Sequence, residues 1–593
     1  MLDYIVIGAA GPSGLCAAKT ILECEPDAQL KILDGNKSLG GVWAQENLFP
    51  GLKTNNVRNR IDFSDFYMDD RFGIKPGQHV TGEVMHQYLQ EYAERADLIS
   101  RISLGSKVLE VSRDPSGTGW VVRLDREVDG TLQSRKLIVA VGATNVPHRP
   151  SIRGAETFNR PIIHSGELGK RGDVLSATSS TESVAVLGGG KSAYDAVYLA
   201  ASKGRTVEWI IRKSGKGPEW IFPSHTYLGP FKALREQLPS RRIVSVFSPC
   251  LWNDGMRYLR AFLHFTTLGK KIAQKFWTNI HVKTLGDCGM LNDEKTKVLE
   301  PETGPFWYGT ASGVLSYDQD FYSLLKSGQV RVHREDISHL SEGQINLLNG
   351  QALNVDVLVT ATGFSAKPTL QFTPTSSHAD LGVPSTSFTQ EQHEFWSALN
   401  KAADAQIAAS FPRLLIGPHL SPSSDTPQPV RPYDPSLYPE LNYTPFQLYR
   451  GIAPPGPTSR GDNSLVFISM FSNLANTPRC ELQCLWAYAY LNNKLDIDRS
   501  NVYKDTALMS RYVRHRAPYG HGRFIPDLVF DQLPYMDTLL QDLKLRYWRK
   551  SNVFAELFAP YTSTDYKGVV REWALANLPT SKAATSETTP LLK

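Results

Sequence analysis

Two glycine-rich loops constrain the fold of this chain more than any other feature. The first reads IVIGAAGPSGL and carries Gly8, Gly11 and Gly14. The second reads VAVLGGGKSAYDA and carries Gly188 and Gly190, with Ala193 in the third position. Each loop follows a run of β-branched residues and precedes a helix-like stretch, which is the context in which such a loop binds a dinucleotide. The sequence therefore predicts two bound dinucleotides.

The spacing within each loop has a physical reason. The first glycine makes a tight turn, the second lets backbone amides approach a pyrophosphate, and the third position lets helix pack on strand. The N-terminus of the helix then faces the anion. The second loop fits this template. The first has two alanines between Gly8 and Gly11, so either Ala9 replaces the first glycine, with φ below zero, or the turn carries an extra residue.

Periodic segments around the loops predict an α/β fold. The opening unit is a strand at 4–7, the first loop, a helix at 13–24 and a strand at 30–34. Alternating, turn-bounded segments at 105–142 predict a hairpin-like region. A second strand–helix–strand unit covers 183–212, helices are expected at 480–493 and 534–548, and segments rich in proline and serine at 366–387 and 417–463 predict surface loops.

Composition excludes several classes of protein. The chain has 593 residues, a net charge of +5 and no long basic run, which argues against a nucleic-acid partner. Its six cysteines are scattered, which favours a reducing, cytoplasmic compartment over a disulfide framework. The first strand begins so early that no signal peptide is expected, and no apolar run is long enough to span a membrane. No metal site is expected.

One segment keeps two interpretations open. Residues 251–277 combine aromatic side chains with arginine and lysine at helical spacing. We expect an ordinary helix packed on the nucleotide domain, but the pattern is also typical of a membrane-surface helix or a lid over a substrate channel. Peripheral contact with an intracellular membrane, and a homodimer, therefore stay open.

Motifs spread over nearly the whole chain share one family pattern. After the first loop come SLGGVWAQ, LKTNNVRNRIDFSDF, TFNRPIIHSGEL and TATGF, and later FWYGT, LYRGIAPPG and ELQCLWAYAYL. Together these motifs resemble those of flavin-containing monooxygenases, in the branch associated with fungal secondary metabolism. The resemblance implies that Asn55 is the flavin-facing asparagine, which hydrogen-bonds near the N5/C4a edge and holds NADP in place.

The resemblance also implies a reaction. FAD is reduced by hydride from NADPH, and the reduced flavin reacts with O2 to give a C4a-hydroperoxide. That species oxygenates a small lipophilic metabolite by hydroxylation, epoxidation or N- or S-oxygenation. The flavin performs the oxygen chemistry, while the protein supplies orientation and excludes water.

Charged residues after each loop indicate which nucleotide it binds. Asp34 lies about 20 residues after Gly14, where an acidic side chain accepts from the ribose hydroxyls of an adenosine. Arg212 and Lys213 follow the second loop at a similar distance, and cationic side chains there suit a 2′-phosphate. We therefore expect FAD at the first loop and NADPH at the second.

The other expected cofactor-binding residues adjoin these motifs. They are Ser13, Gly14, Gly40, Gly41, Trp43 and Thr54 for FAD, Lys191, Ser192 and Ala193 for NADPH, and Thr362 and Gly363 at an inter-domain hinge. His164 is expected to be structural. Cys480 and Cys484 lie four residues apart on an expected helix and are interpreted as buried apolar side chains.

The expected fold class is α/β with two dinucleotide-binding, Rossmann-like domains, the NADP domain being inserted into the FAD domain. The first part of the FAD domain covers 1–165. The NADP domain covers 166–345, with a helical insertion near 217–320. The second part of the FAD domain, with the C-terminal face, covers 346–575, and 576–593 is expected to be a disordered tail.

Three alternatives to this function remain. Arg160 and Leu168 stand where the family's motif around His164 has a glycine and an aromatic residue. This departure disfavours Baeyer–Villiger oxygen insertion, which is nevertheless the nearest rival. An NADPH–disulfide reductase needs a close cysteine pair, usually C-x-x-C, and the pair Cys480/Cys484 has the wrong spacing. The irregular first loop suggests the third alternative, a flavin-binding protein that has lost turnover.

Overall fold

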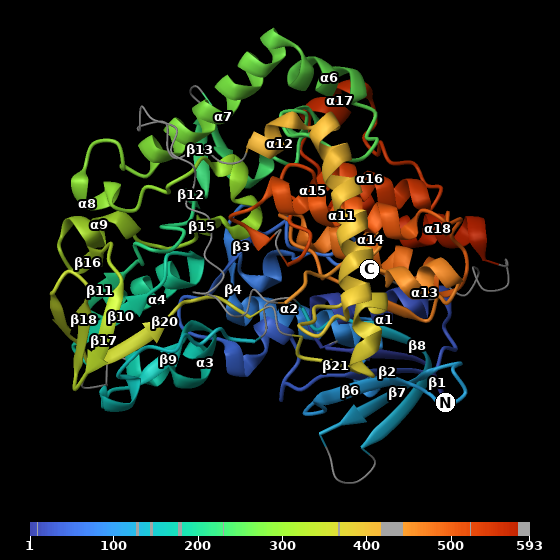
Figure 1. Cartoon of the computed structure of the whole chain (residues 1–593), viewed down its shortest axis with the longest axis horizontal. Helices are drawn as coiled ribbons and strands as arrows, with labels where there is room; N and C mark the ends of the chain where they lie inside the picture. The colour runs from blue at the N-terminus through green and yellow to red at the C-terminus, as the bar shows by residue number, and fades with distance from the viewer. Residues whose placement is uncertain are drawn as a thin grey trace.

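The molecule is built on two separate sheets, each of which carries one glycine loop. The computed structural model describes residues 1–8, 10–125, 130–142, 146–175, 181–228, 231–365, 368–416, 443–521 and 524–578. In Figure 1 the first sheet lies at the lower right and the second at the left, with helices above both. The expected α/β fold with two Rossmann-like units is confirmed.

The first sheet has the order β21-β6-β7-β8-β1-β2-β5, and β22 also pairs with β8. β1 pairs in parallel with both β2 and β8, while β6, β7 and β8 form an antiparallel meander. The strands are β1 (Leu2–Ile7), β2 (Leu30–Leu33), β5 (Ile102–Ser103), β6 (Val108–Arg113), β7 (Trp120–Leu124), β8 (Thr131–Val139), β21 (Gln371–Thr373) and β22 (Leu465–Phe467). Helix α1 (Pro12–Cys24) joins β1 to β2, and α2 (Gly82–Arg95) follows the short pair β3 (Lys53–Val57) and β4 (His79–Thr81).

The second sheet is entirely parallel, with the order β16-β11-β10-β20-β9. Its strands are β9 (Ile162–His164), β10 (Ser183–Leu187), β11 (Thr206–Ile210), β16 (Val330–His333) and β20 (Val357–Thr360). Helices α3 (Leu168–Arg171), α4 (Lys191–Ser202) and α9 (Phe321–Lys326) connect them, and a small antiparallel sheet of β17 (Ile337–Ser341), β18 (Gln344–Leu347) and β19 (Ala352–Asn354) precedes β20.

Two chain segments cross between the sheets and pair with each other. His148 N donates to Gly363 O at 3.0 Å, and Ser365 N donates to Val146 O at 2.8 Å. Both crossings lie beyond the range 166–345 predicted for the NADP domain. The second sheet also includes β9 and β20, which lie outside that range: β20 pairs with β10, and β9 pairs with β20.

The insertion forms its own subdomain between β11 and α9. It contains the parallel pair β12 (Ile221–Pro223) and β15 (Gly313–Leu315), the hairpin β13 (His225–Leu228) and β14 (Phe231–Leu234), and helices α5 (Arg242–Ser245), α6 (Arg257–Phe265), α7 (Thr267–Asp287) and α8 (Glu294–Lys297). In Figure 1, α6 and the green α7 lie at the top of the molecule, with α17 (Val553–Phe558) beside α6.

The C-terminal part is helical. It comprises α10 (His378–Leu381), α11 (Gln390–Ser410), α12 (Pro412–Ile416), α13 (Pro455–Arg460), α14 (Asn476–Leu491), α15 (Val502–Arg516), α16 (Gln532–Asp542), α17 (Val553–Phe558) and α18 (Val569–Asn577). Every residue of α14 after Asn476 is buried, since this helix packs between α1 and α16. The expected tail begins inside α18, and 579–593 lie outside the described residues. No helix among the described residues is long and apolar enough to cross a membrane.

Candidate functional site

The first glycine loop leads into a helix N-terminus that no side chain caps. Gly11 is the residue before α1, and Pro12 follows it. Gly8 has φ +72°, and a Cβ there would lie 2.5 Å from Val141 Cα, so only glycine fits. Uncapped amides at a helix N-terminus bind anions, so this end of α1 fits the pyrophosphate of a flavin dinucleotide. Ala9, on which the loop's irregularity depends, lies outside the described residues.

The segment after β2 touches this loop backbone to backbone. A Cβ on Gly41, whose φ is +63°, would lie 2.9 Å from Gly11 Cα. Gly40 N donates to Ala10 O at 2.6 Å. Trp43 follows in the same segment and is partly buried. The predicted FAD residues on both segments therefore meet at the N-terminus of α1.

Asp34 holds the loop from the end of β2. Its Oδ2 accepts from Ala10 N at 3.1 Å, and its Oδ1 accepts from Asn36 N at 2.8 Å. Burial raises the pKa of Asp34. Each oxygen keeps a second lone-pair direction for a ribose hydroxyl, so the predicted ribose contact stays a prediction.

Ser13, in the first turn of α1, contacts a serine that the sequence did not reveal. The two hydroxyl oxygens of Ser13 and Ser469 are 2.6 Å apart. Ser469 has φ +63° although it is not glycine. Such strained residues cluster at functional sites, but nothing in the local sequence pattern marks Ser469. Gly14, one residue after Ser13, is buried against the core.

Strand β3 places two neighbouring asparagines on opposite faces. Asn56 is buried, and its Nδ2 donates to Glu236 Oε2 at 2.8 Å and to Leu474 O at 3.0 Å. Thr54, two residues before Asn56 on the strand, is buried too, and its Oγ1 accepts from Val80 N at 3.0 Å. Asn55 is exposed, and its side chain forms no hydrogen bond to any residue that the structure describes. Asn55 thus has the free amide that its predicted role needs, whereas Asn56 joins β3 to the insertion and the C-terminal part.

The second glycine loop repeats the arrangement of the first. Gly188 has φ +144°, and a Cβ there would overlap Ala361 O. Gly190 precedes α4, whose N-terminus also has no side-chain cap. In the first turn, Lys191 forms an ion pair with Asp195, Ser192 is half-buried and Ala193 is fully buried. The uncapped amides of α4 fit a second pyrophosphate.

A carboxylate that the sequence did not predict lies at this helix N-terminus. Glu219 N donates to Gly189 O at 2.9 Å, and a Cβ on Gly190 would overlap Glu219 Oε2. Burial raises the pKa of Glu219 to about 7, and Lys216 acts in the opposite direction. An ionised Glu219 would compete with a pyrophosphate for the same amides.

Arg212 and Lys213 follow β11 at the carboxyl edge of the second sheet. Gly188 N donates to Ile210 O at 3.0 Å, so the end of β11 lies beside the glycine loop. Lys213 is exposed and Arg212 is half-buried. The two cations therefore lie at the edge where a nucleotide bound by the second loop would present its ribose.

Thr362 and Gly363 lie in the crossing that leaves the second sheet. Thr362 Oγ1 donates to His148 O at 2.6 Å, and a ring nitrogen of His164 lies 3.0 Å from Gly363 O. The other ring nitrogen of His164 accepts from Gly166 N at 3.0 Å. Burial lowers the pKa of His164. These contacts fix the crossing, which agrees with the structural role expected for His164.

The insertion and the C-terminal part meet at a buried aspartate that sequence reasoning missed. Asp527 accepts from Thr310 N and Thr310 Oγ1, each at 2.8 Å, and from His521 N at 2.7 Å. Burial raises the pKa of Asp527. Thr310 belongs to the FWYGT motif, but its partner lies over 200 residues further on.

Comparisons with known proteins agree with this architecture. A family profile described as pyridine nucleotide-disulphide oxidoreductase matches residues 5–225, which include both glycine loops. The FAD-dependent monooxygenase rstn6 of Aspergillus nomiae is 32% identical over 97% of this chain and 98% of its own. An FAD-dependent monooxygenase of Pyrenophora dematioidea is 32% identical over 94% of this chain and 100% of its own.

Solved structures share the fold at low identity. A steroid monooxygenase bound to NADP has a TM-score of 0.57 and 16% identity, covering 91% of this chain and 97% of its own. A closed cyclohexanone monooxygenase has a TM-score of 0.55 and 14% identity, with the same coverage.

Two Rossmann-like units with uncapped glycine loops define a two-dinucleotide oxidoreductase. The chain belongs to the FAD-dependent monooxygenases. The predictions of the family, of an enzyme, of FAD and of fungal relatives are thereby confirmed. The disulfide-reductase alternative loses its support, because the two relatives above, which cover 97% and 94% of this chain, are named monooxygenases.

Proposed function

We propose that this protein uses NADPH and O2 to oxygenate a small lipophilic metabolite of a secondary pathway, by hydroxylation, epoxidation or N- or S-oxygenation. One observation carries the proposal. The helices α1 and α4 both begin at glycine loops without a side-chain cap, at the carboxyl edges of two sheets that paired crossings connect. One dinucleotide at each loop is what electron transfer from a nicotinamide to a flavin requires.

The first loop and its neighbours would hold FAD, which when bound supplies the redox and oxygen chemistry. The amides before α1 face its pyrophosphate, and Gly41 lets the two backbone segments close on it. Asp34 holds the loop in place through Ala10 N. Asn55 offers its amide from the exposed face of β3 and orients the nicotinamide nucleotide against the flavin.

The second loop would hold NADPH. The amides before α4 face its pyrophosphate, and Arg212 and Lys213 favour the 2′-phosphate that distinguishes NADPH from NADH. Glu219 accommodates the anion only when its carboxyl group is neutral or turned away from Gly190.

An isotope experiment tests the reaction. The purified, FAD-loaded protein is incubated with NADPH, ¹⁸O2 and a panel of lipophilic metabolites. We expect O2-dependent oxidation of NADPH, and one ¹⁸O atom in a product of one panel member. NADPH oxidation that yields only H2O2 with every panel member would favour a protein that has lost oxygen transfer.

The proposal includes peripheral contact with a membrane. Helix α6 exposes Tyr258, Phe262 and Phe265, which recur on one face, and Tyr258 is 89% exposed. The neighbouring exposed side chains form a surface that we term the apical face. It consists of Tyr258, Phe262 and Phe265 of α6, Leu268 and Ile272 of α7, and the exposed cations Arg257, Lys270, Lys271 and Lys275.

The charge of the apical face favours an anionic lipid surface over a second copy of the chain. Residues 255–286 contain no aspartate or glutamate. A symmetric dimer through this face would bring like charges together, whereas anionic headgroups attract them. The opposite face of α6 packs against the rest of the protein, because Leu259 and Leu263 of α6 belong to one hydrophobic cluster with Leu557 of α17. Aromatic tips with basic neighbours are typical of helices that lie in a lipid interface.

A further inference from the structure

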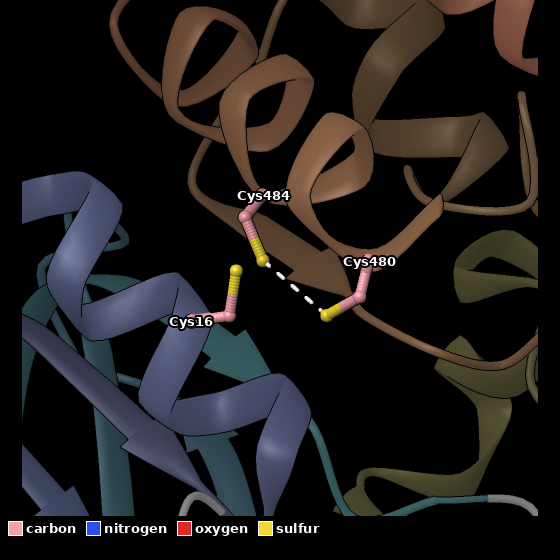
Figure 2. A group of neighbouring side chains, drawn as sticks. All are labelled: Cys16, Cys480 and Cys484. Atoms are coloured by element: carbon pink, nitrogen blue, oxygen red, sulfur yellow. Dashed lines mark hydrogen bonds between the residues drawn. The ribbon is translucent and has the colours of Figure 1, made fainter. Parts of the chain in front are cut away.

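Three buried cysteines from two helices direct their sulfur atoms toward one another. Cys16 lies on α1, and Cys480 and Cys484 lie one turn apart on α14 (Figure 2). The Sγ atoms of Cys480 and Cys484 are 3.9 Å apart, and all three sulfur atoms lie within 4.8 Å of one another. None of the three residues is more than 3% exposed.

The spacing of the sulfur atoms is close to that of a metal–thiolate site. All three cysteines are free thiols. In a tetrahedral zinc site with Zn–S bonds of about 2.3 Å, two sulfur ligands lie about 3.8 Å apart. The pair on α14 already has this separation, because residues at i and i+4 share a helix face. Cys16 faces them from α1, so only a small inward movement completes a three-sulfur site.

A buried cation beside the cluster supplies a second observation. Arg479 is 4% exposed and precedes Cys480 on α14. Its guanidinium donates to Gln483 Oε1 at 3.0 Å and to Ser469 Oγ at 3.3 Å, but its Nε has no partner. Among the described residues, no carboxylate forms an ion pair with Arg479. Burying a guanidinium without an anion costs free energy, so a negative charge near Arg479 would stabilise the folded protein.

We propose that Cys16, Cys480 and Cys484 bind one Zn²⁺ ion as thiolates. Three thiolates and Zn²⁺ carry a net charge of −1, which the charge of Arg479 balances. A water molecule or the Ser13 carbonyl oxygen, which lies 3.8 Å from Cys484 Sγ, can take the fourth position. Binding releases the three thiol protons to solvent and changes no oxidation state. Thiolate ligands select zinc over the hard cations magnesium and calcium.

The site would fasten the FAD loop to the core. Cys484 Sγ lies 3.8 Å from Ser13 O, in the first turn of α1, and Cys16 lies one turn further along that helix. Zinc would therefore connect the helix that begins the FAD site to the buried helix α14. Packing of three small apolar thiols is the rival explanation of their burial. In that case the FAD pyrophosphate would supply the negative charge for Arg479, because Ser469 connects Arg479 to Ser13 in the first turn of α1.

Metal analysis of the intact, FAD-loaded protein tests the site. Wild type, Cys16→Ala and Cys484→Ala are incubated with ZnCl2, dialysed and measured for zinc and for FAD. Cys24→Ala is the matched control, because Cys24 is another buried free cysteine on α1 outside the cluster. We expect about one zinc per chain in wild type and in Cys24→Ala, and at least about tenfold less in the two cluster variants.

If a variant fails to retain FAD, the wild-type protein alone still tests the zinc site. Its zinc X-ray absorption spectrum should show three sulfur ligands at about 2.3 Å. Wild type without bound zinc, equal zinc in all four proteins, or a disulfide between Cys16 and either cysteine of α14 would each overturn the proposal. None of these outcomes bears on oxygen transfer, so the two proposals stand or fall separately.

Discussion

The carboxylate of Glu219 lies over Gly190, at the helix N-terminus where the second glycine loop would receive a pyrophosphate. The loop that carries Glu219 is held there by the bond from Glu219 N to Gly189 O, at 2.9 Å. Because burial raises the pKa of this carboxyl to about 7, its charge changes within the physiological range. Binding of NADPH should therefore be linked to a proton.

The sign of this linkage follows from the raised pKa. Below about pH 7 Glu219 is neutral and does not oppose the pyrophosphate, while above it the ionised carboxylate must be protonated or displaced. The Kd for NADPH should then rise with pH between 6 and 8.5, by up to about tenfold per unit. Three other titratable groups interact electrostatically with Glu219, namely Lys216, Tyr194 and Tyr308. Burial raises the pKa of both tyrosines above this pH range, so neither tyrosine changes charge within it.

Direct binding by fluorescence checks this prediction. Glu219→Gln should bind NADPH with an affinity that varies less with pH, and more tightly than wild type at pH 8.5. Titration of the 2′-phosphate is common to both proteins and cancels in the comparison. Glu302→Gln is the control, since Glu302 is paired with Arg334 at 2.9 Å instead. Parallel pH profiles for wild type and Glu219→Gln would contradict the assignment.

Arg212→Ala should weaken selection for NADPH. A charge-assisted contact with the 2′-phosphate contributes about 1.5–3 kcal/mol, or about 10- to 150-fold in affinity. The KM for NADPH should rise by that factor, while the KM for NADH changes little. Lys203→Ala, an exposed cation just after α4, should alter neither value. Equal increases for both nucleotides would remove the role of Arg212.

Gly41→Ala should weaken FAD binding more than it destabilises the fold. Its Cβ would lie 2.9 Å from Gly11 Cα, so the two segments must separate at the N-terminus of α1. Gly51→Ala is a matched control, because Gly51 also has a positive φ, +84°, but nothing lies within 4 Å of its Cβ position. Both variants carry about 1–2 kcal/mol of backbone strain. Only Gly41→Ala should purify with depleted FAD, and similar FAD content in both would argue against a cofactor role for this contact.

Substitutions at the neighbouring residues Asn55 and Asn56 should have different effects, one on the reaction and the other on stability. Asn56→Ala removes a donor from the carboxylate of Glu236, whose side chain is 8% exposed, so it should destabilise the protein by about 1–3 kcal/mol and lower Tm. Asn55→Ala removes an exposed side chain and should leave Tm unchanged. Its effect should be on coupling, seen as more H2O2 released per NADPH oxidised. A lower Tm for Asn55→Ala, with coupling intact, would reverse the two assignments.

Local geometry was readable from the sequence, whereas long-range contacts were not. Gly188 and Gly190 were found because a strand, a turn and a helix N-terminus lie within about ten residues. Glu219 escaped notice because it reaches Gly190 only through a loop that folds back. Ser469 and Asp527 likewise act through partners hundreds of residues away.

Element bounds show the same division. The helix α1 and the strands β1 and β2 were predicted to within two residues. Helix α11 was missed although Thr389 and Gln392 form a capping box at its start, a signal that was present in the sequence. The segment 251–277 became two helices, α6 and α7, because α6 ends at Phe265 and Thr266 caps α7.

The apical face gives the last prediction. Vesicles with an anionic lipid should retain the protein on sedimentation, and zwitterionic vesicles should retain less, because headgroup charge adds to aromatic insertion. Tyr258→Ser with Phe262→Ser should weaken partitioning about thirtyfold, since each of the two rings contributes on the order of 1 kcal/mol when partly inserted. Leu348→Ser, an equally apolar residue that is 64% exposed beside β18, should have no effect.

Salt and oligomeric state separate the lipid interface from its rivals. Raising NaCl from about 0.1 M to 0.5 M should weaken binding to anionic vesicles, because the Debye length shortens from about 10 Å and the attraction between the lysines and the headgroups is screened. Wild type that remains monomeric in light scattering agrees with a lipid partner. The opposite result would be a wild-type dimer that does not bind vesicles and that dissociates when Tyr258→Ser and Phe262→Ser are combined. That result would assign the apical face to a second copy of the chain instead.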